Sequence, residues 1–409
     1  MADHQTFVIV GASLAGASAA RTLRDEGFRG EIHLIGAEEH LPYIRPPLSK
    51  DYLAGNADRA SVFVESKTWY TDSDVKFHPG TRAVSIDLED RLVGTDDGGS
   101  RRYDRLLLTT GSRPRRLTVP GATLAGVHYL RTLDDSEVLR SLLAEGGKQL
   151  VVVGSGWIGM EVAATARTLG NEVTILDRGA VPLAAALGPE IGALFATLHE
   201  EHGVVVRRSV VVESLIGPGD QVTGVLLAGG EIVPADLVLV GIGAVPNVEL
   251  AQTAGLAVDN GILVDANLET SDPHVFAAGD VANAQHPLVK LRLRNEHWAN
   301  ALKGGPVAAR AMLGQNVSFD TIPYFYTDQF DLGMEYSGFG SLSTDAELIY
   351  RGDPNGREFV VFWLNAARVI AGMNVNVWNV QDAVQRLIRR GHPVDPARLA
   401  DESIPLDAV

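Results

Sequence analysis

Three glycines in the middle of the chain have the spacing G-x-G-x-x-G and follow an apolar run. The run is Leu150–Val153, and the glycines are Gly154, Gly156 and Gly159. In this pattern the first glycine permits a tight turn, the second lets backbone N–H groups approach a pyrophosphate, and the third lets a helix pack closely on a strand. The chemistry that these residues predict is the binding of a dinucleotide.

The segments on either side of this turn must position it. Residues 162–169 have the apolar spacing of a helix, and Glu172–Leu176 is predicted to be the next strand, ending on Asp177. A carboxylate at this place can accept hydrogen bonds from a ribose 2′-OH. Together these features predict a dinucleotide-binding βαβ unit, in which Ile158 is a further candidate contact.

A second unit of the same kind begins near the N-terminus. The predicted strand Thr6–Val10 runs into a glycine turn, an apolar helix follows, and Glu31–Ile35 is the next predicted strand. Ser13 stands where the middle glycine is expected, and its hydroxyl can donate to a phosphate. Two such units predict two dinucleotides in one chain and electron transfer between them. The candidate contacts of the first turn are Gly11, Ser13, Ala15 and Gly16.

The two halves of the chain also end alike. Leu106–Leu108 is a predicted buried strand that is followed by Thr110 and Gly111. The predicted strand before Gly243 is likewise followed by small residues and a proline. Thr110, Gly111 and Gly243 are further candidate cofactor contacts.

A third apolar strand ends in Gly279 and Asp280. A carboxylate there can bond a polyol chain such as ribityl, and we expect a helix directly after it, whose first N–H groups would face anionic oxygen. This segment must return to the first unit, so the second unit is predicted to be inserted into the first.

The composition excludes several classes of function. A chain of 409 residues makes about two to three domains, and a net charge of −16 argues against general nucleic-acid binding. We find no membrane-spanning apolar run and no secretory leader, so we expect a cytoplasmic protein. With no cysteine, thiol relays, zinc–thiolate sites and iron–sulfur sites are excluded, and we expect no metal.

The motifs together resemble a known family, the FAD-dependent, NADH-using ferredoxin reductases of the putidaredoxin reductase type, which serve cytochrome P450 and ring-hydroxylating dioxygenase systems. The resemblance covers essentially the whole chain. It rests on the two glycine turns, the second ending at Glu161, and on Arg45-Pro-Pro-Leu-Ser-Lys50, Thr109-Thr-Gly111, Ala278-Gly279-Asp280, Asn295–Ala301 and Tyr324–Phe330.

The resemblance implies an α/β fold with two Rossmann-like dinucleotide-binding domains of the glutathione-reductase kind, the second inserted in the first. The expected domains are an FAD-binding domain (1–113 and 241–321), an NAD-binding domain (114–240) and a C-terminal α+β domain (322–409).

The resemblance also implies the roles of individual residues. The first turn would bind FAD and the second NADH, with Lys50 and Glu161 as the catalytic pair beside the flavin and the nicotinamide. That pair would keep either charge from being buried alone. The further FAD contacts that it implies are Glu38 near the adenosine ribose, Arg45, Ala83 through its backbone, Arg131, Asp280 beside the ribityl chain, and Trp298 beside the isoalloxazine.

The implied activity is hydride transfer from NADH to FAD, followed by release of single electrons to a [2Fe–2S] ferredoxin. Two alternatives stay open: reduction of another acceptor, such as rubredoxin, a quinone or monodehydroascorbate, and a non-enzymatic flavin-bound NADH sensor. The basic segment 286–310 is the expected ferredoxin docking surface, through Lys290, Arg292 and Arg310. We expect a monomer or a weak homodimer.

Overall fold

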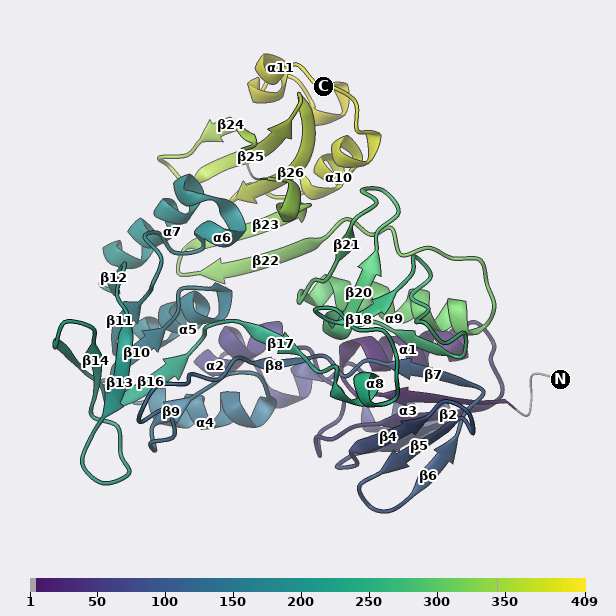
Figure 1. Ribbon diagram of the computed structural model, residues 1–409. Helices are drawn as coiled ribbons and strands as arrows, with labels where there is room; N and C mark the ends of the chain where they lie inside the picture. The colour runs from purple at the N-terminus through teal and green to yellow at the C-terminus, as the bar shows by residue number, and fades with distance from the viewer. Residues whose placement is uncertain (1–4, 344) are drawn as a thin grey trace. The chain divides into compact units, whose positions relative to one another are not determined.

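The computed structural model describes residues 5–343 and 345–409, and its chain separates into two compact units (Figure 1). The first unit comprises Met1–Ile44, Arg59–Arg113 and Val245–Pro323. The second comprises Arg45–Asp58, Pro114–Ala244 and Tyr324–Val409. Two of the five places where the chain passes from one unit to the other lie within short strands, β8 (Ser112–Pro114) and β17 (Ala244–Pro246).

A parallel five-stranded sheet forms the centre of the first unit. All its neighbouring strands pair in parallel, and their apolar side chains are buried on both faces, as parallel sheets require. β19 comes late in the chain and lies beside β7, so the chain does return to the first unit after the inserted segment, as predicted. The strand order is β19 (Val275–Ala277), β7 (Arg105–Leu108), β1 (Thr6–Val10), β2 (Glu31–Ile35) and β3 (Val75–His78).

Smaller elements complete this unit. The acidic and glycine-rich residues 96–99 form the hairpin turn between β5 and β6. The helices are α1 (Leu14–Asp25), α3 (Lys67–Asp72), α8 (Glu249–Thr253) and α9 (Trp298–Met312), with 3-10 turns η3 (Arg59–Val62) and η4 (Gly279–Val281). The other strands are β4 (Ala83–Asp87), β5 (Leu92–Thr95), β6 (Ser100–Arg102), β18 (Ile262–Val264), β20 (Ala282–Gln285) and β21 (Arg292–Leu293).

The second unit contains another parallel five-stranded sheet, which carries the inserted glycine turn. Its order is β12 (Val205–Arg207), β11 (Glu172–Leu176), β10 (Gln149–Val153), β16 (Leu237–Val240) and β9 (Val127–His128). Between β12 and β16 the chain forms an antiparallel meander of β13 (Val212–Ile216), β14 (Gly224–Leu227) and β15 (Ile232–Pro234). Its helices are η2 (Pro46–Ser49), α2 (Asp51–Ala54), α4 (Leu133–Leu143), α5 (Trp157–Thr168), α6 (Ala184–Leu187) and α7 (Pro189–Glu201).

The C-terminal part of the second unit is an antiparallel five-stranded sheet with helix α10 packed on β23 and β26 (Figure 1). α10 buries Val384, Leu387 and Ile388 on one side, the spacing of an amphipathic helix. The sheet order is β22 (Tyr324–Gln329), β23 (Leu332–Gly338), β26 (Arg368–Val375), β25 (Glu358–Asn365) and β24 (Glu347–Asp353). The remaining elements are α10 (Gln381–Arg390), α11 (Pro396–Ala400), η5 (Gly340–Leu342) and η6 (Leu406–Ala408).

Both predicted βαβ units are present, and the predicted α/β fold with a further C-terminal domain is confirmed. One expectation was wrong: no α-helix follows Gly279 and Asp280 directly, because these residues lie in the three-residue 3-10 turn η4 and the chain then continues into β20. The predicted domain boundaries stay a prediction. In the part of the chain that the structure describes, no helix is both long and apolar enough to cross a membrane.

Helices α1 and α9 pack closely in the first unit because a glycine lies at their contact. A Cβ added to Gly305 would collide with the backbone carbonyl of Ala15, whereas a Cβ on the neighbouring Gly304 would meet its nearest atom, the Cβ of Ala278, at 3.7 Å. The helix contact therefore leaves no room for a methyl group at Gly305, whereas a methyl group at Gly304 would make an ordinary van der Waals contact.

We therefore expect opposite effects from two adjacent substitutions. Gly305→Ala should destabilise the protein by roughly 1–3 kcal/mol, because α9 must move away from α1. Gly304→Ala should be neutral or stabilising by up to about 1 kcal/mol, because alanine favours the helix. Chemical unfolding of both variants measures this, and equal stabilities would contradict the packing described.

Candidate functional site

The first glycine turn joins β1 to α1. Gly11 has φ +116°, and a Cβ there would collide with the carbonyl of Thr109 at the end of β7. The Thr109 hydroxyl donates to the carbonyl oxygen of Gly11 at 2.7 Å. The turn is therefore fixed against the neighbouring strand, and only glycine fits at its first position.

Ser13 is the N-cap residue of α1 and has extended backbone angles. Within the described chain its hydroxyl makes no capping hydrogen bond, so the first N–H groups of this twelve-residue helix are not satisfied by Ser13. Such N–H groups and the helix dipole favour an anionic oxygen. Gly279 lies against this helix, since a Cβ on Gly279 would be 3.2 Å from that of Ala15. The structure thus brings Ser13, Ala15 and Gly279 together.

Asp280 follows in the η4 turn and is only 8 % exposed. Its carboxylate accepts a hydrogen bond from Ser112 Oγ at 2.9 Å. Burial lowers the pKa of the nearby His297 to about 4, an effect that the charge of Asp280 opposes, so this imidazole is neutral at pH 7. Trp298, the first residue of α9, comes next in the chain.

The other predicted residues of the first unit occupy its loops and strand ends. The Tyr43 hydroxyl donates to Glu38 Oε2 at 2.5 Å, and the N–H of Gly80 donates to the Glu38 carbonyl at 3.0 Å. Ala83 is the first residue of β4, three positions after Gly80. Thr110 and Gly111 are joined to Asn247, whose amide donates to the Thr110 carbonyl at 2.8 Å.

The second glycine turn, between β10 and α5, repeats this geometry. Gly154 has φ +101°, and a Cβ there would be 2.5 Å from the Gly241 carbonyl oxygen; at Gly159 a Cβ would collide with the Gly154 carbonyl. A Cβ on Gly156 would meet no atom closer than the Gly241 carbonyl oxygen, at 3.9 Å. The space in front of Gly156 therefore stays open.

Ser155, inside this turn, is 3 % exposed, and its buried hydroxyl has no hydrogen-bond partner among the described residues. A buried hydroxyl without a partner is costly unless a ligand or water supplies one. The open space at Gly156, the start of α5 and this hydroxyl fit the phosphates of a dinucleotide. Ile158 is 42 % exposed in the first turn of α5, although it is a large apolar residue.

The acid at the end of β11 is also oriented. Asp177 Oδ1 accepts a hydrogen bond from the N–H of Gly179 at 2.7 Å, and the Gly154 N–H bonds the Leu176 carbonyl at 2.8 Å, which holds the end of β11 beside the turn. The next residue, Arg178, is exposed. Gly243 lies beyond the end of β16, with φ +105°.

Lys50 and Glu161 form an ion pair within the second unit. Lys50 Nζ lies 2.7 Å from Glu161 Oε2, and the two side chains are 12 % and 5 % exposed. Ser49 Oγ donates to the same oxygen at 2.5 Å, and Thr327 Oγ1 donates to Glu161 Oε1 at 2.7 Å. The Tyr326 ring lies 5.6 Å from Lys50 Nζ. This carboxylate, two positions after Gly159, therefore has donors on both of its oxygens.

The proline-rich segment before Lys50 is held in place by backbone contacts. Arg45 donates to the carbonyl of Arg131, whose own N–H donates to Asp135 Oδ2 at 3.0 Å. Arg45, Lys50 and Arg131 all belong to the second unit, and the structure joins Arg45 to Arg131 and Lys50 to Glu161.

Sequence reasoning gave no role to Ser49 or Thr327. Both lie inside motifs that carry the family resemblance, Arg45–Lys50 and Tyr324–Phe330, and that was the only signal for them. Their hydroxyls become significant only once folding brings them to Glu161.

The basic segment 286–310 is less open than its composition indicates. Arg310 Nε pairs with Glu26 at 2.7 Å, and Arg292 donates to the carbonyls of Val264 and Asn283 at 3.1 and 3.0 Å. Lys290 is exposed, next to the exposed Leu291. Arg292 is exposed too, but of the three predicted docking residues only Lys290 makes no side-chain hydrogen bond or ion pair to another described residue.

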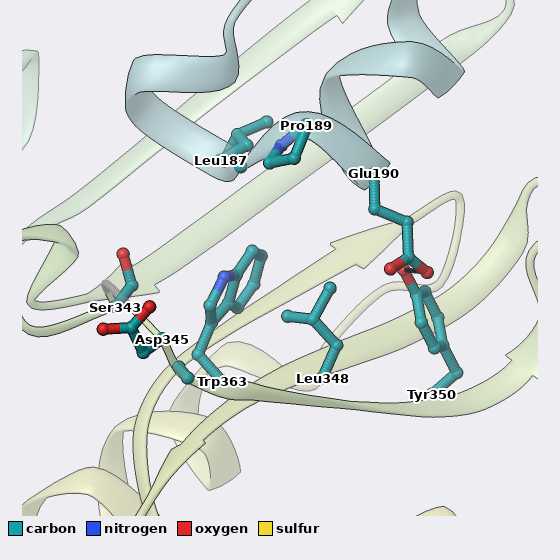
Figure 2. Close-up of a pocket in the computed structure, with 10 residues that line it drawn as sticks. Leu187, Pro189, Glu190, Ser343, Asp345, Leu348, Tyr350 and Trp363 are labelled. Carbon is teal, nitrogen blue, oxygen red and sulfur yellow. Dashed lines mark hydrogen bonds between the residues drawn. The ribbon is translucent and has the colours of Figure 1, made fainter.

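A cavity of about 400 Å³ lies between the α6–α7 connection and the C-terminal sheet (Figure 2). Leu187, Leu348 and Trp363 form its apolar wall, and Tyr350 donates to Glu190 at 2.6 Å at its edge. None of the predicted site residues lines this cavity.

Two family models match the chain. The model described as pyridine nucleotide-disulphide oxidoreductase matches residues 5–305, and the one described as reductase C-terminal matches residues 324–409. The first family binds FAD and NAD(H).

Individual relatives match over nearly the whole chain. The ferredoxin–NAD(+) reductase component of the anthranilate 1,2-dioxygenase system of Burkholderia cepacia is 41 % identical over 98 % of both chains. Putidaredoxin reductase of Pseudomonas putida is 38 % identical over 100 % of this chain and 97 % of its own. The structure of a covalent putidaredoxin reductase–putidaredoxin complex contains a chain that superposes with a TM-score of 0.94, at 39 % identity over 98 % of this chain and 97 % of that one.

Two glycines of the second turn should respond differently to alanine. Gly156→Ala should leave the unfolding temperature nearly unchanged but weaken NADH binding about tenfold or more, because its methyl group would occupy the open space at the turn. Gly159→Ala should instead destabilise the fold by roughly 1–3 kcal/mol, because its methyl group meets the Gly154 carbonyl. Calorimetry and a nucleotide titration separate the two effects, and normal NADH binding by Gly156→Ala would contradict this role.

Proposed function

Because the chain belongs to the pyridine nucleotide-disulphide oxidoreductase family and to its ferredoxin reductases, we propose that it is an NADH-dependent ferredoxin reductase that serves an oxygenase. When bound, the two cofactors supply the redox chemistry: a hydride passes from NADH to FAD, and electrons leave singly for a [2Fe–2S] ferredoxin. The observation that carries the proposal is the buried Lys50–Glu161 pair, whose carboxylate lies on α5 two positions after the last glycine of the second turn.

The residues of the chain would bind the two cofactors and orient them. The turn at Gly11 with Ser13 and Asp280 supports FAD binding, and the turn at Gly156 with Asp177 supports NADH binding. Lys50 would supply a cation near the reacting rings of the bound cofactors, and Glu161 neutralises that cation, since an unpaired buried charge is costly. No side chain needs to act as a nucleophile.

The absence of cysteine separates this chain from thiol-dependent members of the family, whose description includes disulphide reduction. A reductase that acts through a thiol relay needs a reactive thiolate. This chain has no thiol that could relay electrons from a bound flavin, which favours a partner that would accept electrons directly.

One experiment tests the proposal. The purified protein should be yellow with FAD bound without a covalent link, and anaerobic NADH should bleach it. Turnover should then be compared with a [2Fe–2S] ferredoxin, a rubredoxin, a quinone and monodehydroascorbate, and kcat/KM should be highest for the ferredoxin. A higher kcat/KM for another acceptor would show that the protein is a reductase of that acceptor. If NADH does not reduce the flavin, the result would favour a flavin-bound NADH sensor.

Coenzyme selectivity depends on Asp177. Its carboxylate would meet the 2′-phosphate of NADPH as a like charge, so we expect a higher kcat/KM for NADH. Asp177→Ala should reduce that preference, and Arg178→Ala should increase it because the neighbouring guanidinium favours the phosphate. Equal kcat/KM values for the two coenzymes in the unaltered protein would show that Arg178 dominates.

Ferredoxin docking should depend on the segment 286–310, and Lys290 gives the clearest test. Lys290→Glu should raise the KM for ferredoxin and flatten its salt dependence, because rim charges act mainly on association. Arg310→Glu would also replace the ion pair with Glu26 by two neighbouring carboxylates, so it is a less specific change. Lys67→Glu, an equal charge change at an exposed residue of the same unit, is the matched control. Reduction of a small neutral acceptor should not change, and equal losses with both acceptors would refute docking at this segment.

A further inference from the structure

Four buried polar side chains form a line in the second unit that begins at Glu161. Thr327 Oγ1 donates to Glu161 Oε1 at 2.7 Å, and Gln329 Nε2 donates to Thr327 Oγ1 at 3.1 Å. Gln329 Oε1 lies 2.8 Å from His199 Nε2. The four residues are between 0 and 4 % exposed, so solvent does not compete for these bonds.

The donor and acceptor of each bond follow from the charge at one end. Because an ionised carboxylate only accepts, the single hydroxyl proton of Thr327 must point to Glu161. Thr327 can then only accept from Gln329, so the Gln329 carbonyl faces His199. His199 Nε2 must therefore carry a proton. The ionised carboxylate of Glu161 therefore sets the donor and the acceptor in all three hydrogen bonds.

The surroundings of His199 support this assignment. Burial is the main cause that lowers its pKa to about 4, so the ring is neutral at pH 7 and carries one proton. Its Nδ1 has no hydrogen-bond partner among the described residues, and the Phe330 ring lies edge-on at 5.1 Å between centroids. Gln329 is thus the residue that selects the tautomer of His199.

We propose that Thr327, Gln329 and His199 form a one-directional hydrogen-bond relay that holds Glu161 as an ionised acceptor and so positions the Lys50–Glu161 pair. This role rests on the proposed function, in which that pair lies beside the reacting rings. The three residues are positioning residues, since they act through Glu161.

The two carboxylate oxygens of Glu161 accept hydrogen bonds from different segments of the chain. Oε2 accepts from Lys50 and Ser49, on the segment before α2, and Oε1 accepts from Thr327 on β22. The relay continues from β22 to His199 on α7. The carboxylate is therefore held from two sides and cannot rotate away from Lys50 without breaking a charge-assisted bond.

The first test reads the tautomer of His199 by ¹⁵N NMR of its ring, assigned with His199→Asn. The unaltered protein should show the Nε2–H form. In Glu161→Gln, Lys50 and Ser49 hold the new amide oxygen on their side, so the amide N–H group faces Thr327. The relay then reverses, and His199 should shift to the Nδ1–H form. Thr327→Val should give a mixture of both forms.

The second test measures the rate of flavin reduction by NADH in the holoenzyme. Thr327→Val should slow it about tenfold or more, the effect of one lost hydrogen bond to a charged group. Thr327→Ser should restore a rate near that of the unaltered protein. Thr168→Val is the control for the same substitution on α5, the helix that carries Glu161, because the exposed Thr168 hydroxyl donates to the Ala164 carbonyl at 2.9 Å and not to a residue of the relay.

The outcomes separate the relay from the proposed function. A His199 ring in the Nδ1–H form in the unaltered protein, or one that is unchanged in both Glu161→Gln and Thr327→Val, would refute the relay. If one of these variants fails to fold, the other decides. Failure of the unaltered protein to accept electrons from NADH would refute the proposed function, while the NMR result would stand by itself.

Discussion

The buried ion pair between Lys50 and Glu161 imposes the strictest requirement on the second unit. Both side chains are almost fully removed from solvent. Removing one partner of a buried pair typically costs about 3–5 kcal/mol, because the other charge is left uncompensated. The sequence must therefore deliver a cation, an anion and enough hydrogen-bond donors to the same place. Three separate segments do so: the proline-stiffened turn before α2 brings Lys50 and Ser49, α5 brings Glu161, and β22 brings Thr327.

The glycine turns explain how α5 reaches that place. Close packing of Gly159 on the Gly154 carbonyl fixes the helix against β10, and Glu161 follows two positions later. The same short stretch of helix thus has the open space at Gly156 at its start and the Glu161 carboxylate in its next turn. This arrangement places the glycine turn and the carboxylate of the ion pair on one rigid element, so that their separation is set by the helix and not by a loop.

Much of the fold could be predicted because the glycine spacing and the apolar strands are local features. Both parallel sheets follow from the two turns, and the return of β19 to the first sheet follows from chain order. The family resemblance supplied the Lys50–Glu161 pair, which local spacing alone does not give. The relay from Glu161 through Gln329 to His199 could not be predicted, because its bonds join residues 166 and 130 positions apart. The expected helix after Asp280 was wrong because a strand follows the short turn there. The ion pair of Arg310 with Glu26 likewise depends on α1 and α9 lying side by side.

A double-mutant cycle on flavin reduction by NADH tests the central claim, that Lys50 and Glu161 act as one unit. The rates of Lys50→Met, Glu161→Gln and the double variant should be compared by stopped-flow absorbance on FAD-loaded protein. If each charge exists to balance the other, the double variant should be no slower than the slower single variant, because it leaves no buried charge without a partner. Losses that multiply in the double variant would show that the two residues act independently and would contradict the account.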